Sequence, residues 1–510
     1  MLPGFPILSW LVFIPLLGAI VILFIGERRH TILRVWALLV SLADFALSLA
    51  LYFRWADVPG MQFVEYSPWI GELGIGYHLG VDGLSLFFVL LTTFLTPVAI
   101  FASWELIKER VKTYLFFMLL LETGVLGVFL SLDLVLFYVF WEAMLVPMYF
   151  LIAGWGGERR GHAAFKFFLY TMAGSALMLI AILAMAFLHR AQAGRMSFDL
   201  LQLQRALSAS ALRDWLFIAF ALAFAVKAPL VPLHSWLPDA YGEAPIPVAV
   251  LLAGVLSKMG VYGFLRFCLP LFPEQVGAFG PALCALALIG IIYGSLTALG
   301  QKDVKQLIAY SSIAHISLIV LAVFVLNVQA LAGGILQVVN HGVNIAALFL
   351  LAGMLHERQK TLNMEEMGGL WARLPIFGGF LLLAILASVG LPPLNGFVGE
   401  FTILVGVFRV KATYAVIAAL SIILSAWYML HLFRRVMEGP GGEPVSKEVA
   451  AEAAGGKRGD LSAREMLVLL PLVVAIFLIG LFPNLFFSKM EPAVEGLVEQ
   501  SQRTVIIVER

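Results

Sequence analysis

The sequence is poor in charge and nearly empty of cysteine. Only 13% of its 510 residues are charged, whereas soluble domains carry about a quarter. The formal net charge of +1 offers no basic surface for nucleic acid, so we expect no nucleic-acid partner. Cys268 and Cys284 stand alone in apolar stretches, without a Cys-x-x-Cys or Cys/His cluster. These absences argue against structural zinc, covalently attached haem and iron–sulfur clusters.

Nucleotide-binding and secretion signals are missing as well. No Gly-x-Gly-x-x-Gly stretch opens a helix after a strand, so a dinucleotide fold is not indicated. We therefore expect no cofactor and no metal on this chain. The N-terminus, MLPGFPILSW, has no basic segment and no small-residue cleavage site after it. Its apolar stretch is interpreted as a retained first membrane span.

Long apolar runs dominate what is present. Hydrophobic residues make up 61% of the chain, and the mean hydropathy is +0.97. A bilayer core of about 30 Å requires roughly 20 apolar residues per helix. The sequence therefore predicts an all-α polytopic membrane protein with about 14 spans, near 6–25, 32–53, 80–103, 114–132, 134–153, 163–188, 215–235, 246–268, 277–299, 304–326, 328–355, 376–408, 412–433 and 465–487.

The connections between the spans predict an orientation and two longer loops. Residues 54–78 alternate in a way that suits a short surface hairpin, and the polar segment 434–464 is typical of a mobile cytoplasmic loop. Lys and Arg are more frequent in the loops that face the cytoplasm if both termini lie outside. Asp133 and Asp239 fall at the ends of spans, where a charge costs little free energy. We interpret them as helix-capping residues or as residues at the mouth of the transport path.

Two spans carry matching interruptions. The seventh contains KAPLVPLH and the twelfth contains LPPLNGFVGE, so each combines Pro or Gly with an ionisable residue. The two lie five spans apart, and a repeat of five spans inserts its second copy upside down. Inverted repeats with broken helices at matching places point to a transport site. We therefore predict two inverted five-helix repeats with discontinuous helices 7 and 12.

Four ionisable residues lie well inside apolar runs: Glu142, Lys227, Lys258 and Glu400. Each costs about 2.5–3.5 kcal/mol at a helix centre, so roughly 10–14 kcal/mol together. A lysine side chain reaches about 6 Å, whereas the interface lies about 15 Å from mid-span, so the lysines do not reach the surface. A structural ion pair is one explanation, and proton or ion conduction is the one we favour.

Glu142 and Lys227 suggest a gate. Low dielectric favours the neutral forms of both amines and carboxyls, so a lysine holds its proton while a carboxylate is near and releases it when that partner withdraws. Pro229 and Pro232 free backbone carbonyls beside Lys227, and such backbone is tolerated in a membrane where it lines a cavity or is buried in protein.

Further polar residues within spans are candidate relay groups. His234, His315 and His341 titrate near physiological pH, and each is either a relay station or an ordinary hydrogen-bonded histidine. Glu122 is a second mid-span acid, either another partner for a lysine or a local structural group.

These residues lie in stretches that resemble the antiporter-like membrane subunits of respiratory NADH:quinone oxidoreductase (complex I), specifically its chain M. The matching stretches are FYVFWEAMLVPMYFLIAGWGG, KAPLVPLHSWLPDAYGEAP, GVLSKMGVYGFLRF, DVKQLIAYSSIAHI, NHGVN–AALFLLAG and PLNGFVGEF. The resemblance covers nearly the whole chain. It implies fourteen helices, with helices 4–8 and 9–13 as the two repeats. The implied division is 1–110 (helices 1–3 and hairpin), 111–270, 271–436, 437–464 (polar loop) and 465–510 (helix 14 and tail).

The resemblance also implies a function. The chain would be a non-redox, proton-translocating subunit, with Glu142 and Lys227 as the controlling pair, Lys258 as the central relay and Glu400 as the terminal group. Flavin, iron–sulfur clusters and the quinone site would belong to partner subunits. Sibling chains L and N would be its neighbours in a bacterial plasma membrane, with lipid around them.

Two positions distinguish this chain within the family. Glu400 stands where chains L and N and the cation/proton antiporter subunits carry lysine, which resembles chain M. Tyr241 stands where the family often has histidine, so a histidine relay at that place is in doubt. The alternatives to the complex I function are a subunit of a multisubunit cation/proton antiporter, a hydrogenase-related membrane complex, and a purely structural scaffold.

Overall fold

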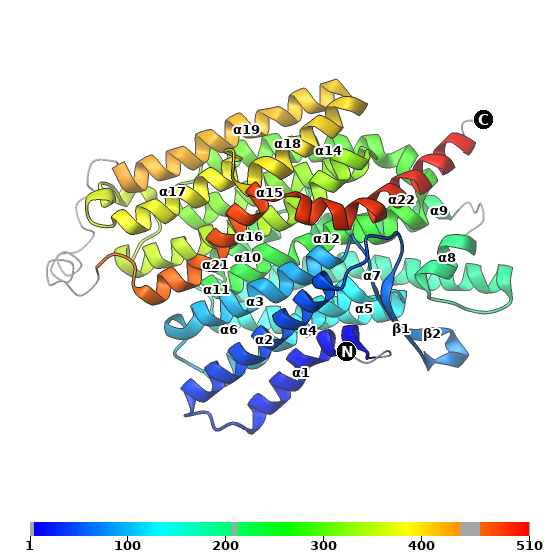
Figure 1. Cartoon of the computed structure of the whole chain (residues 1–510), viewed down its shortest axis with the longest axis horizontal. Helices are drawn as coiled ribbons and strands as arrows, with labels where there is room; N and C mark the ends of the chain where they lie inside the picture. Colours follow the sequence, from blue (N-terminus) through cyan, green and yellow to red (C-terminus); the bar gives the residue numbers. More distant parts are fainter. Residues whose placement is uncertain (1–4, 207–211, 439–458, 509–510) are drawn as a thin grey trace.

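The fold is a bundle of long, roughly parallel helices (Figure 1). The computed structural model describes residues 5–206, 212–438 and 459–508. Within these residues twelve segments are long and apolar enough to cross a membrane, which confirms the predicted class. They are α1 (Ile7–Phe24), α2 (His30–Phe53), α3 (Leu86–Leu106), α4 (Val111–Leu130), α5 with α6 (Leu134–Ala143 and Leu145–Trp155), α7 (Arg160–Ala193), α11 to α13 (Ile246–Leu251, Lys258–Gly263 and Leu269–Leu271), α14 (Pro273–Leu299), α15 (Val304–Phe324), α16 (Val328–Gln359), α19 (Ala412–Phe433) and α21 (Ala463–Leu481).

Two further segments are interrupted helices, at the places where the sequence predicts discontinuous helices 7 and 12. The first consists of α9 (Arg213–Lys227) and α10 (Trp236–Glu243), and the second of α17 (Pro375–Val389) and α18 (Asn395–Val410). Each pair adds one candidate crossing to the twelve. The total of fourteen, the inverted five-helix repeat and the domain boundaries stay predictions.

The first interruption follows from its prolines. Pro229 and Pro232 have no N–H, so the carbonyls four residues earlier lose their helical partners. The structure satisfies part of this backbone in other ways. The Leu230 N–H donates to the Ala225 carbonyl at 2.9 Å, and the indole N–H of Trp236 donates to the Val226 carbonyl at 2.8 Å. The residues directly after Lys227, up to Leu230, are thus buried in protein, as lipid requires, whereas Pro232 is exposed at the surface of this chain.

The second interruption begins at a glycine. Gly390 follows α17 with a φ of +81°, and its N–H donates to the Leu386 carbonyl. A left-handed residue after the last helical turn ends a helix, and glycine adopts this conformation without a Cβ penalty. Pro392 and Pro393 then prevent the helix from resuming before α18.

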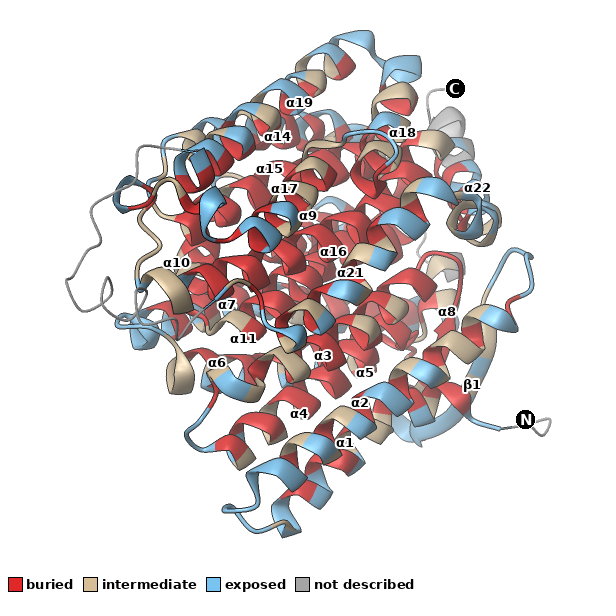
Figure 2. Ribbon diagram, turned by 60° about the vertical axis from the view of Figure 1, so that its left-hand side comes forward, coloured by how far each residue is buried: buried red, intermediate tan, exposed pale blue. Residues whose placement is uncertain are grey.

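Burial is greatest in the middle of the bundle. Figure 2 shows buried residues gathered in the central helices and exposed residues on the outer ones, such as α1 and α19. In α16 and in the segment Ile246–Leu271, the most apolar window is wholly buried inside this chain. A helix that is apolar all round and buried belongs to the core, so these two segments are the axis around which the others pack.

A hairpin and a terminal helix lie at one end of the bundle (Figure 1). Strands β1 (Gln62–Ile70) and β2 (Ile75–Val81) pair antiparallel, in the region for which the sequence predicts a hairpin. His78 Nδ1 lies 2.6 Å from a carboxylate oxygen of Asp199, just before α8 (Leu200–Ala206), which ties the hairpin to the bundle. The last helix, α22, spans Asn484–Val508.

Asp133 confirms its predicted capping role. Its side chain accepts hydrogen bonds from the Val135 and Leu136 N–H groups at the start of α5, and from Gly76 N–H of the hairpin. An aspartate in this position satisfies N–H groups that have no partner inside the helix. Of the predicted polar loop 434–464, residues 439–458 lie outside the described residues.

Candidate functional site

Lys258 has several hydrogen-bond partners in the membrane interior. It begins α12, directly after a π-helical turn at residues 252–256, and it is fully buried. Its ammonium nitrogen hydrogen-bonds the Ala253 carbonyl, lies 3.3 Å from Ser257 Oγ and lies 2.7 Å from Nδ1 of His341. The π-helical turn, a feature frequent at functional sites, immediately precedes this lysine. Lys258 therefore has a direct side-chain neighbour to exchange a proton with.

The contact with His341 continues to Glu400. His341 on α16 and His315 on α15 have ring centroids 5.4 Å apart. His315 Nδ1 in turn lies 3.1 Å from a carboxylate oxygen of Glu400 on α18. Four residues predicted from the sequence thus form one buried series, Lys258–His341–His315–Glu400, contributed by four different helices.

Glu400 is held in place by amides. Its carboxylate accepts a hydrogen bond from Gln337 Nε2 at 3.0 Å, and Gln337 Oε1 accepts one from Asn340. Gly399 makes this close packing feasible, because a Cβ there would lie 2.2 Å from Gln337 Oε1. The neutral amide of Gln337 thus helps to orient the carboxylate toward His315.

Lys227 has a different environment. It is the last residue of α9 and is 1% exposed. Its ammonium nitrogen lies 3.8 Å from the sulfur of Met144, 5.0 Å from the ring centroid of Phe167 and 5.7 Å from that of Trp141. Aromatic faces attract a cation, but they accept no proton. Lys227 is therefore stabilised where it lies without a direct proton acceptor.

Glu142 lies near Lys227 without touching it. It is half-buried on α5, and its carboxylate interacts electrostatically with Lys227, while Ser175 and Tyr138 lie beside it. No direct ion pair joins the two residues, and one carboxylate oxygen is buried without a hydrogen-bond partner. The predicted controlling pair is thus close in space and separated in this conformation.

A glycine lets the two backbone segments that carry the lysines cross closely. A Cβ on Gly260 would lie 2.4 Å from the Ala228 nitrogen and 2.5 Å from the Phe224 carbonyl oxygen. Only a residue without a side chain allows α12 to contact the broken end of α9 so closely. Lys258 lies two residues before this contact and Lys227 one residue before it, so both lysines lie beside the same helix crossing.

His234 and Glu122 have partners outside the series. His234 Nε2 lies 3.3 Å from the hydroxyl of Tyr293 on α14, and its ring packs edge-on against that tyrosine. Glu122 on α4 is buried with both carboxylate oxygens unpartnered, and it interacts electrostatically with Asp44 on α2. Neither residue is hydrogen-bonded to Lys227 or Lys258, and their relay roles stay predictions.

The sequence interpretation missed several polar residues of the interior, among them Asp44, Gln337 and the buried ion pair of Arg266 with Asp82. Asp44 is fully buried, and neither of its carboxylate oxygens has a partner. An aspartate in the middle of a 24-residue apolar helix was a signal of the same kind as Glu142. Gln337 gave no such signal, because a neutral amide in a span is unremarkable until its contact with Glu400 is known.

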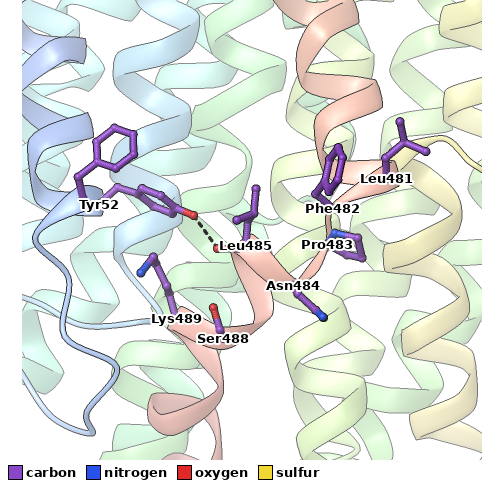
Figure 3. Close-up of a pocket in the computed structure, with 9 residues that line it drawn as sticks. Tyr52, Leu481, Phe482, Pro483, Asn484, Leu485, Ser488 and Lys489 are labelled. Atoms are coloured by element: carbon purple, nitrogen blue, oxygen red, sulfur yellow. Dashed lines mark hydrogen bonds between the residues drawn. The ribbon is translucent and has the colours of Figure 1, made fainter.

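The grooves on the surface of the molecule lie away from these buried residues. Figure 3 shows one of about 560 Å³ where α2 ends beside the turn between α21 and α22. Tyr52 donates to the Leu485 carbonyl across it, and Lys489 lies on its wall. The groove contains none of the proton-carrying candidates. In the described part of the chain, no group of three or more His, Cys, Asp or Glu residues could hold a metal ion.

Comparison with known proteins agrees with this geometry. Residues 131–425 match the family model described as NADH:quinone oxidoreductase/Mrp antiporter, TM, and residues 12–128 match that of NADH-ubiquinone oxidoreductase chain 4, amino terminus. A chain of respiratory complex I from Thermus thermophilus with bound NADH superposes with a TM-score of 0.86 and 33% identity, over 97% of this chain and 99% of that one. The Mrp complex from Dietzia, at 21% identity and a TM-score of 0.79, shares the fold.

Relatives that match over nearly their full length show to which branch of the family the chain belongs. NADH-ubiquinone oxidoreductase chain 4 of Marchantia polymorpha is 41% identical over 98% of both chains. NADH-quinone oxidoreductase subunit M of Rhodobacter capsulatus is 41% identical over 97% of this chain and 96% of its own. The chain therefore belongs to the antiporter-like membrane proteins of the NADH:quinone oxidoreductase/Mrp family. Within that family it belongs to the subunit M, or chain 4, branch, since both relatives match it from end to end.

Proposed function

We propose that this chain translocates protons as subunit M in the membrane arm of an NADH:quinone oxidoreductase. The observation that carries the proposal is the buried series Lys258–His341–His315–Glu400. Four ionisable side chains in succession, inside segments that cross a membrane, are costly to bury and match a proton relay. Neither a scaffold nor a lipid-facing bundle requires them.

The two lysines have different roles in this proposal. Quinone reduction in another subunit changes the electrostatic environment of Glu142 and thereby the protonation of Lys227. Lys227 then loses its proton toward Lys258, across the crossing that Gly260 permits. From Lys258 the proton passes through His341 and His315 to Glu400, and it leaves on the outer side. The electrostatic change is passed to the neighbouring antiporter-like subunits, for which chains L and N are our proposal.

The chain takes part in the redox enzyme without carrying its redox groups. We propose that flavin and iron–sulfur clusters reside in partner subunits, since this sequence has neither their ligand motifs nor a dinucleotide fingerprint. The excess of Lys and Arg in alternate loops supports an orientation with both termini outside a bacterial plasma membrane.

The test uses the isosteric variant Glu142→Gln and the variant Lys227→Ala in the assembled complex. We expect normal NADH:ferricyanide reductase activity, which reports assembly, and strongly reduced NADH-driven proton uptake into inverted membrane vesicles. The matched control is Lys166→Ala, which removes a lysine of α7 that is paired with Asp239 at 2.7 Å nearer the surface. Normal pumping by an assembled Glu142→Gln complex would contradict the gate.

A second candidate function is cation/proton exchange without an oxidoreductase. It is favoured by the family model, whose description includes the Mrp antiporter, and by the shared fold. Purification of the native complex distinguishes the two functions. Flavin- and iron–sulfur-bearing partners support the oxidoreductase, whereas sodium-dependent proton exchange by a complex that lacks such partners supports the antiporter.

A further inference from the structure

Tyr241 carries a buried hydroxyl that the proposed relay does not use. It lies near the end of α10 and is fully buried, and its ring packs edge-on against Phe349 of α16, with centroids 5.6 Å apart. Its hydroxyl has no hydrogen-bond partner among the residues that the structure describes. A buried hydroxyl without a partner is unfavourable, and phenylalanine would fill the same space without that cost. The ring alone therefore does not explain a tyrosine at this position.

The hydroxyls nearest to Tyr241 lead toward Lys258. Ser257 and Ser312 both lie beside the phenol oxygen, one on the segment of Lys258 and the other on the helix of His315. Ser257 Oγ is 3.3 Å from the Lys258 ammonium nitrogen. Ser312 is fully buried, and its hydroxyl also has no partner. Two unpartnered hydroxyls and a third one bonded to Lys258 thus lie together in the interior.

The C-terminal end of α10, next to Tyr241, is polar. Lys305 at the start of α15 donates to the carbonyls of Gly242 and Ala244, one and three residues beyond Tyr241. Glu243, the last residue of α10, pairs at 3.5 Å with Arg159, whose side chain is exposed. Tyr241 therefore lies between solvent-accessible charged groups and the buried Lys258.

We propose that Tyr241, Ser312 and Ser257 hold a water molecule and form a proton entry branch to Lys258 that does not pass through Lys227. The proposal rests on the proton-translocating function proposed above. Buried water typically bonds two to four otherwise unsatisfied polar groups, and the hydroxyls of Tyr241 and Ser312 are two such groups. Hydroxyls both donate and accept, so each can receive a proton on its oxygen while releasing the one it held.

The transfer is balanced without any net charge on the tyrosine. A proton that arrives from the polar end bonds to an oxygen of the branch, and the O–H proton on the far side moves on to the next oxygen. Ser257 donates its hydroxyl to the Ala253 carbonyl in this conformation. For the last transfer that hydroxyl rotates toward the neutral amine of Lys258 and protonates it, and Ser257 regains a proton from its neighbour in the branch. A phenylalanine at position 241 interrupts this exchange, because a ring carbon neither donates nor accepts.

The test compares Tyr241→Phe with Tyr114→Phe in the assembled complex. Tyr114 on α4 is an equally buried tyrosine with an unpartnered hydroxyl beside a serine, Ser103, and it is outside the proposed relay. For Tyr241→Phe we expect NADH-driven proton uptake to fall roughly threefold to tenfold, less than the loss of a direct acid–base group, because displaced water partly replaces the hydroxyl. Tyr114→Phe should pump normally, and both variants should keep ferricyanide reductase activity.

A third variant separates a relay from a packing role. Tyr241→His replaces the phenol with another side chain that both donates and accepts, and we expect it to recover more activity than Tyr241→Phe does. Normal pumping by Tyr241→Phe overturns the branch, and so does equal loss in the Phe and His variants. If Glu142→Gln also pumps normally, the translocating function itself fails. If Tyr241→Phe pumps normally and Glu142→Gln does not, the translocating function stands and the entry branch is excluded.

Discussion

The regions around the two buried lysines are built on different principles. Lys258 is in hydrogen-bond contact with His341 and Ser257, and its series of contacts reaches Glu400. Lys227 is surrounded by the rings of Trp141 and Phe167 and by a sulfur atom, with Glu142 close but not in contact. In the proposed mechanism, the first environment passes a proton on, whereas the second holds a charge until its partner Glu142 changes. The difference teaches that burial of a lysine alone does not define its role.

Replacing the connected lysine should have the largest effect. Lys258→Met keeps an unbranched side chain of similar length and removes the group that bonds Ala253, Ser257 and His341. We expect NADH-driven proton uptake to fall about a hundredfold. This is the lower end of the range of rate losses that follow removal of an acid–base group. Assembly is checked by ferricyanide reductase activity, and retention of half the wild-type pumping rate would contradict the series.

An arginine in place of the isolated lysine sharpens the comparison. Lys227→Arg keeps the positive charge and the attraction to the aromatic rings, but arginine does not release its proton at physiological pH. We therefore expect proton uptake to fall roughly tenfold, to a rate between that of wild type and that of the neutral variant Lys227→Ala. Wild-type pumping would mean that Lys227 only needs to be charged, and Lys166→Arg is the control for the substitution itself.

The histidines offer a matched pair with a smaller expected effect. His315 contacts Glu400 and His341, whereas His234 contacts Tyr293. We expect His315→Ala to lower proton uptake about fivefold or more, and His234→Ala less than about twofold, because only the first removes a member of the connected series. Equal losses in the two variants, measured in the same vesicles, would mean that both histidines conduct.

The smallest effect is expected at a buried carboxylate that serves folding. Asp133→Asn keeps an oxygen that caps α5 and weakens the bond to Gly76, at a cost of about 1 kcal/mol in stability. Thermal unfolding of the purified complex should shift slightly downward, and proton uptake per NADH should stay at the wild-type value. A clear loss of pumping in this variant would show that any buried carboxylate supports transport, which removes the distinction drawn above.

Much of the fold was predictable, because lipid restricts the chain to a few solutions. Apolar runs of roughly 20 residues mark the spans, and each run near 32–53, 304–326 or 412–433 has a helix at nearly the same place. Pro229 and Pro232 predicted the first broken helix through the missing N–H groups, and the LPPLNG stretch predicted the second. The four mid-span charges were equally visible, because a charge in an apolar run is rare.

The contacts within the site were not predictable in the same way. His341 is 83 residues from Lys258, and no local pattern relates the two positions. Three histidines looked alike in sequence, yet two lie in the connected series and His234 pairs with a tyrosine. Asp44 was visible in the sequence and was overlooked, while its proximity to Glu122 depends on how α2 packs against α4.

The sequence by itself determined which segments enter the membrane, where two of them break and which charged residues lie inside. Hydropathy and the chemistry of proline act locally along the chain, so both the spans and their interruptions can be predicted from short stretches of sequence. Only the tertiary structure decided that Lys258 meets His341, that Glu400 meets His315, and that Lys227 is left among aromatic rings. Those outcomes depend on the packing of buried helices from distant parts of the chain, where a single glycine such as Gly260 sets how closely two backbones approach.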